Sequence, residues 1–127
     1  MATLPAEFRL IRLELAREPG HPEGSRRTGY ELVAPLGADQ RLSAELWRKH
    51  RDSCRVRRFH EGEVDQAGRL ARRPGGEWYF DYDPDSSRDD EAGHRLGDER
   101  FVIGEYVSIA DEDGHMHTYR VVSVQPA

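Results

Sequence analysis

The clearest pattern along the chain is the alternation of apolar and polar residues over short segments. Ile11, Leu13 and Leu15 alternate with the charged residues Arg12 and Glu14. A period of two places the apolar side chains on one face of a β-strand, whereas a helical face needs spacings of three and four. This segment, 8–16, is therefore predicted to be a half-buried strand. The same reasoning predicts further strands over 30–34, 54–60, 68–73, 77–82, 105–110 and 117–124.

Two connections between these segments have the composition of hairpin turns. Pro74-Gly75-Gly76 separates two of the predicted strands, and Asp113-Gly114 lies between the last two. Gly and Asp tolerate the positive φ angles of tight turns. We therefore expect Gly114 at positive φ, with Val107 and Ile109 pointing inward from the strand that precedes it.

Residues 43–52 are the one segment with a helical pattern. Ser43 is suited to the N-cap position, and Leu46 and Trp47 mark an apolar side. Such a short helix is stable only when that side is packed, so Trp47 is predicted to belong to the core. Two segments, 17–28 and 83–97, are too polar for either pattern and are predicted to be loops, the second of them acidic and flexible.

Together these elements predict a mainly β fold, an antiparallel meander that closes into a small barrel or roll with one short α-helix. Closure of the sheet would remove its exposed edges. The 127 residues fit one domain spanning 1–127, with 83–97 as a flexible acidic loop within it.

Charge is spread unevenly along the chain. The net charge is −5, yet residues 41–73 carry 10 Arg or Lys against 5 Asp or Glu, and residues 74–113 carry 3 against 13. We expect the two blocks to neutralise each other in the fold. Because Lys49 is the only lysine, the basic residues are nearly all arginine. This bias indicates either bidentate recognition of carboxylates or phosphates, or a compositional preference with no function.

The composition argues against several classes of protein. A single cysteine, Cys54, excludes an internal disulfide framework and a four-cysteine zinc site. The chain has no apolar run long enough for a membrane helix and no secretory signal at its start, so we expect a cytoplasmic protein that does not enter a membrane. Motifs for nucleotide binding or hydrolysis are absent from the sequence, and we expect neither enzymatic activity nor a cofactor. Cys54 itself is interpreted as a small buried residue rather than a nucleophile.

Two sets of residues are candidate metal ligands. Asp81, Asp83 and Asp85 alternate and could supply three of the oxygens that calcium needs, although the rest of a calcium-binding loop pattern is missing. His115 and His117 share one face of a strand and could contact one zinc ion. Two imidazoles without an evident third or fourth ligand make a poor zinc site, so we expect no tight binding there.

Arginines interleaved with aromatic residues form the candidate partner-binding surface. Three functions remain open: a protein-interaction or accessory module, a metal-binding protein, and nucleic-acid binding through an arginine-rich sheet face. We expect the first, with a protein partner, and the sequence leaves the oligomeric state open. The candidate residues of this surface are Arg55, Arg57, Arg69, Arg72, Arg73 and Trp78.

Overall fold

The computed structural model describes residues 4–83, 91–93, 96–111 and 114–127. In this part of the chain one antiparallel sheet has the strand order β6-β5-β4-β3-β2-β1-β8-β7. The strands are β1 (Phe8–Leu15), β2 (Ser25–Pro35), β3 (Arg55–Phe59), β4 (Gln66–Arg72), β5 (Trp78–Tyr82), β6 (Glu91–Gly93), β7 (Tyr106–Ala110) and β8 (Met116–Pro126), with the helix α1 (Ala44–Lys49) and a 3-10 turn, η1 (Arg51–Ser53), between β2 and β3.

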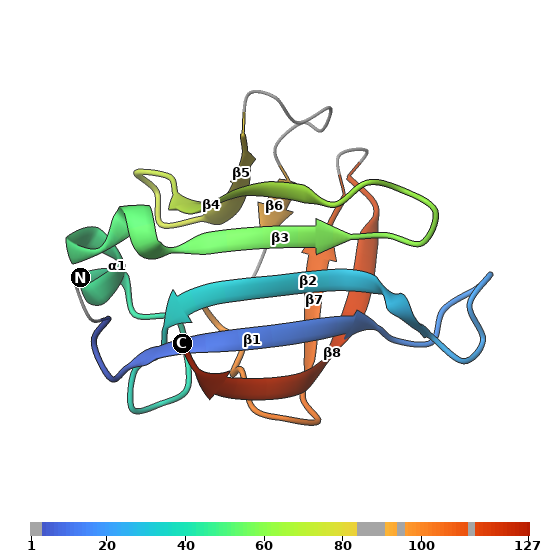
Figure 1. Cartoon of the computed structure of the whole chain (residues 1–127), viewed down its shortest axis with the longest axis horizontal. Helices are drawn as coiled ribbons and strands as arrows, with labels where there is room; N and C mark the ends of the chain where they lie inside the picture. The colour runs from blue at the N-terminus through green and yellow to red at the C-terminus, as the bar shows by residue number, and fades with distance from the viewer. Residues whose placement is uncertain (1–3, 84–90, 94–95, 112–113) are drawn as a thin grey trace.

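The sheet is a meander that curls into a half-barrel. Strands β1 to β6 pair with their neighbours in sequence, and the β7–β8 hairpin joins the other edge of β1 through β8. Figure 1 shows β1, β2 and β3 side by side on one side of the molecule, with β7 and the first part of β8 crossing behind them. The predicted mainly β, antiparallel and curled fold with one short helix is confirmed. No helix among the described residues has the length and apolar character needed to cross a membrane.

The core lies inside the curl and is built from the apolar positions of the alternating patterns. Ile11 and Leu13 of β1 and Val107 and Ile109 of β7 are buried, as their spacing predicts. The ring of Tyr30 lies at the centre, with its centroid 5.2 Å from the ring of Phe80 and 5.1 Å from that of Tyr119. These contacts join β2 to β5 and β8 across the interior.

The helix begins and packs as its sequence predicts. The Ser43 side chain accepts a hydrogen bond from the Leu46 backbone N–H, which caps the first turn. Trp47 is 7% exposed, and its indole N–H donates to the Leu70 carbonyl at 2.8 Å. Its ring also meets that of Trp78 edge to face at 5.6 Å. Trp47 therefore fixes α1 against β4 and β5.

Two turns follow the predicted hairpin chemistry. Gly114 has φ 83° in the β7–β8 turn, and Gly76 has φ 95° in the β4–β5 turn. In the second turn the Gly76 N–H donates to the Arg73 carbonyl, and the Arg73 N–H donates to the Glu77 carbonyl. Both pairs of strands are antiparallel around these turns, as the hairpin predictions require.

Two loop predictions need correction. The predicted loop 17–28 ends earlier, because β2 begins at Ser25, which pairs with Leu15 across a register shift that leaves residues 26–28 of β2 without partners on β1. Backbone hydrogen bonds extend this strand even though its first side chains are polar. Within the predicted acidic loop 83–97, β6 pairs with β5, and Leu96 is fully buried. The rest of that segment, residues 84–90 and 94–95, lies outside the described residues.

Candidate functional site

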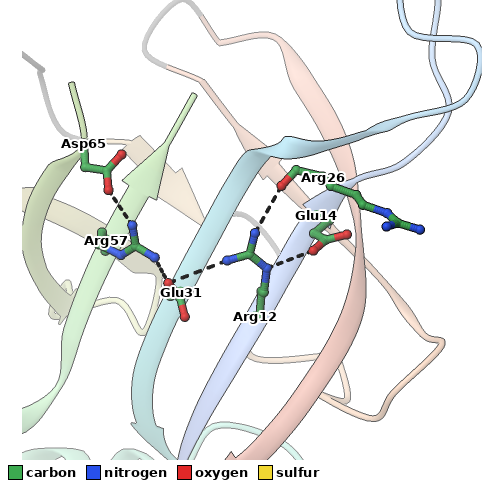
Figure 2. A network of polar contacts seen from close by, with 6 residues as sticks. All are labelled: Arg12, Glu14, Arg26, Glu31, Arg57 and Asp65. Atoms are coloured by element: carbon green, nitrogen blue, oxygen red, sulfur yellow. Dashed lines mark hydrogen bonds and ion pairs between the residues drawn. The ribbon is translucent and has the colours of Figure 1, made fainter. Parts of the chain in front are cut away.

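The arginines of the sheet's outer face are neutralised by carboxylates. Arg12 contacts Glu14 at 2.8 Å and Glu31 at 3.7 Å, while Arg57 forms ion pairs with Glu31 and Asp65. Figure 2 shows this network crossing β1, β2 and β3. The register of the sheet accounts for it, because Glu31 is the Cα partner of both Arg12 and Arg57.

Two further arginines predicted to bind a partner are also paired. Arg55 contacts Asp83 at 3.0 Å, and Arg69 contacts Asp52 at 3.2 Å. Trp78 is 4% exposed and is therefore a core residue rather than part of a surface. Of the five candidate arginines, Arg72 and Arg73 are the two whose side chains have no carboxylate partner among the described residues.

Arg72 and Arg73 line a hollow of about 340 Å³ beside α1, which we call the arginine hollow. Its arginines come from three places: the helix, the 3-10 turn after it, and the β4–β5 hairpin. Figure 1 shows these elements together at one end of the molecule. The residues that line the arginine hollow are Trp47, Arg48, Arg51, Arg72, Arg73 and Pro74.

Aromatic rings hold three of these guanidinium groups in place. The Arg51 Cζ lies 4.7 Å from the centroid of a Trp47 ring, the Arg72 Cζ lies 5.4 Å from Trp78, and the Arg73 Cζ lies 4.2 Å from Tyr79. A guanidinium over a ring face keeps its N–H edge free for a ligand while its orientation is restricted. The stacking therefore orders the arginines without neutralising them.

The packing around Arg72 is tight. A side chain at Gly76 would place its Cβ 3.2 Å from an Arg72 Nη atom, so glycine leaves room for the guanidinium there. The Arg72 Nε is buried and has no hydrogen-bond partner among the described residues. An unpaired buried donor on a charged group costs free energy.

The arginine hollow differs from most of the described surface in that its arginines do not pair with a described carboxylate. The described residues include 16 arginines, of which eight pair with a carboxylate and Arg9 donates to backbone carbonyls. The seven others lie around two hollows. Four line the arginine hollow, and three, Arg17, Arg26 and Arg120, line a second hollow beside the β1–β2 connection.

The candidate metal ligands are engaged elsewhere or separated. Asp83 is bound by Arg55, Asp81 is exposed on β5 opposite Arg69, and Asp85 lies outside the described residues. Over the described ranges, no group of three or more His, Cys, Asp or Glu side chains is placed to hold a metal ion.

The two predicted histidines have different surroundings. His117 lies between two carboxylates, with its Nδ1 2.9 Å from Glu18 and its Nε2 3.0 Å from Asp111. Burial opposes the charged imidazolium, but hydrogen bonds and the charges of Glu18 and Asp111 outweigh it, so the pKa of His117 is raised. His115 is exposed, with its Nδ1 3.8 Å from Asp111. Both histidines therefore lie beside Asp111, and the two carboxylates around His117 favour its charged form.

The cysteine has no feature of a nucleophile. Cys54 is buried, and its thiol lies 3.4 Å from the His50 carbonyl, to which it donates. Burial raises the pKa of the Cys54 thiol to about 11, so little thiolate forms at neutral pH.

Sequence reasoning identified Arg72 and Arg73 but missed Arg48 and Arg51. The spacing of Arg48 and Arg51, three residues apart around the end of the predicted helix and next to Trp47, is the signal that could have identified them. Comparison of the chain with protein-family models, with curated proteins and with solved structures finds no match.

Proposed function

We propose that this protein is a non-catalytic interaction module that binds an acidic segment of a protein partner in the arginine hollow. One observation carries the proposal. Eight arginines elsewhere on the described surface reach carboxylates of the chain itself, whereas the four arginines of this hollow have no carboxylate partner among the described residues. Four guanidinium groups brought together with no carboxylate from the described part of the chain attract carboxylates from outside.

The geometry of the aromatic residues favours an acidic peptide over a nucleic acid. Proteins that bind single-stranded nucleic acid offer exposed rings on which bases stack. Trp47 in the arginine hollow and Trp78 beneath Arg72 are both buried, and a guanidinium group lies over a ring face of each. The net charge of −5 also opposes binding to a long polyanion. The guanidinium groups of the hollow offer pairs of N–H donors, which match the two oxygens of a carboxylate.

We also propose a cellular compartment for the module. We place the module in the cytoplasm, because its one cysteine is buried and a disulfide framework typical of small secreted domains is not possible.

The test is a titration with a capped hexaglutamate peptide, followed by tryptophan fluorescence and by the arginine Nε–H signals in NMR spectra. We expect saturable binding that weakens with added salt, and that falls about tenfold in the double variant Arg48→Gln/Arg51→Gln. Arg69→Gln is the matched control, because that arginine is exposed but already paired with Asp52.

Three results would contradict the proposal. The first is the absence of saturable hexaglutamate binding, and the second is unchanged affinity in the double variant. The third is tighter binding of hexathymidylate than of hexaglutamate, which would favour the nucleic-acid function instead. Circular dichroism of each variant checks that the fold is retained, as expected for substitutions of exposed side chains.

A further inference from the structure

The second hollow, which we call the loop hollow, has a volume of about 850 Å³ and lies between the β1–β2 connection and the outer face of β7 and β8. Its size is in the range of small-molecule sites, and it is larger than the arginine hollow. The β1–β2 connection extends from the end of the molecule opposite α1 (Figure 1). The lining residues that matter for its chemistry are Glu14, Arg17, Glu23, Arg26, Tyr106 and Arg120.

The loop hollow has an excess of positive charge. Arg17, Arg26 and Arg120 are exposed, and within the described part of the chain none of their side chains pairs with a carboxylate. Glu14 is held by Arg12 at 2.8 Å, which leaves Glu23 as the carboxylate of the lining that has no ion pair with the described residues. Figure 2 shows the Arg26 guanidinium pointing away from the ion-pair network, although its backbone carbonyl accepts a hydrogen bond from Arg12. The three arginines and the one carboxylate give the hollow an excess of two positive charges, which matches a ligand group with two negative charges.

The wall that carries Arg17 is fixed to the sheet. The Ala16 N–H donates to the Thr118 carbonyl at 2.9 Å, and Glu18 and His21 exchange backbone hydrogen bonds. Gly24 has φ 73°, and a Cβ there would lie 2.4 Å from the Leu15 carbonyl oxygen, so the connection rests directly on β1. A wall held in this way costs little further entropy when a ligand binds.

Tyr106 gives the loop hollow an exposed aromatic ring, whereas Trp47 in the arginine hollow is buried. It lies on β7 directly opposite Arg120 of β8 and is 57% exposed. An exposed tyrosine beside arginines can stack against a planar ring while the guanidinium groups bind a phosphate.

We propose that the loop hollow binds a nucleoside monophosphate, with the phosphate among Arg17, Arg26 and Arg120 and the base against Tyr106. The phosphate monoester is a dianion at neutral pH and therefore matches the excess charge of the hollow. This site is independent of the acidic-peptide site, because the two hollows share no residue.

The test is a titration of the protein with AMP, followed by backbone and arginine side-chain shifts in NMR spectra. We expect saturable shifts at the residues of the loop hollow, and affinity about tenfold lower in Arg26→Gln and in Arg120→Gln. Inorganic phosphate and adenosine should each bind more weakly than AMP, and Tyr106→Leu should reduce AMP binding to the level of phosphate. Arg48→Gln/Arg51→Gln is the control and should bind AMP as the parent does.

Several outcomes would overturn this proposal without contradicting the function proposed for the arginine hollow. AMP that causes no saturable shifts, or shifts that are unchanged by Arg26→Gln and Arg120→Gln, would exclude the site. Phosphate binding as tightly as AMP would show an adventitious anion only and would remove the role of Tyr106. Loss of AMP binding in the Arg48→Gln/Arg51→Gln control would place the nucleotide in the arginine hollow instead.

Discussion

Replacing Trp47 by alanine tests whether α1 is an integral part of the fold. Three interactions would be lost together: the packing of a side chain that is 7% exposed, the edge-to-face contact with Trp78 at 5.6 Å, and the hydrogen bond to the Leu70 carbonyl at 2.8 Å. Truncation of a buried tryptophan to alanine costs about 3–5 kcal/mol. The unpaired Leu70 carbonyl places the expected loss at the upper end of that range.

This loss is large compared with the whole stability of a small domain, which is about 5–15 kcal/mol. We expect Trp47→Ala to shift the urea midpoint strongly in far-UV circular dichroism, with an unchanged slope if the transition stays two-state. Trp47→Phe is the control, because it keeps a ring in the core but removes the N–H. It should lower the free energy of unfolding by about 1–2 kcal/mol.

The reasoning is refuted if Trp47→Ala unfolds within about 1 kcal/mol of the parent. That result would mean that α1 is peripheral and that β4 and β5 are stable without it. It would also remove the support on which the arginine hollow is built, because Arg48 and Arg51 flank the same residue.

Three further predictions concern single residues. Because its pKa is raised in the folded state, His117 adds stability at low pH that is lost as the pH rises through that pKa, so His117→Gln should destabilise more at pH 6 than at pH 9 in urea unfolding. Gly114→Ala should cost about 1 kcal/mol because of its positive φ, whereas Gly75→Ala, without that strain, should be nearly neutral in the same assay. Cys54 should react with a thiol reagent at the rate of unfolding, since burial raises its pKa to about 11; rapid labelling of the folded protein would contradict this.

The strands could be predicted because their side chains face two different environments. The alternation of Ile11, Leu13 and Leu15 follows from one buried and one exposed face, and the same holds for Val107 and Ile109. The first residues of β2 pair through their backbone but have polar side chains, so they show no alternation. The sequence pattern therefore does not predict that β2 begins at Ser25.

The candidate site could be predicted only in part, because it joins distant segments. Arg72 and Arg73 belong to a recognisable hairpin, but nothing local indicates that α1 packs over it. The position of α1 depends on long-range contacts of Trp47, namely its hydrogen bond to Leu70 and its ring contact with Trp78. Likewise, the pairing of Arg57 with Glu31 follows from the register of β2 and β3, which the sequence pattern does not determine.

The pairing of charges bears on the meaning of the arginine bias. Mutual neutralisation of the basic segment 41–73 and the acidic segment 74–113 is seen at Arg55 and Asp83, but Arg69 pairs within the basic segment itself. A purely compositional bias would leave unpaired arginines scattered over the surface. Instead, apart from Arg9, the arginines without a carboxylate among the described residues line two hollows, each assembled from several elements. Such clustering is expected when ligands supply negative charge, and it supports the proposal that each hollow binds a partner.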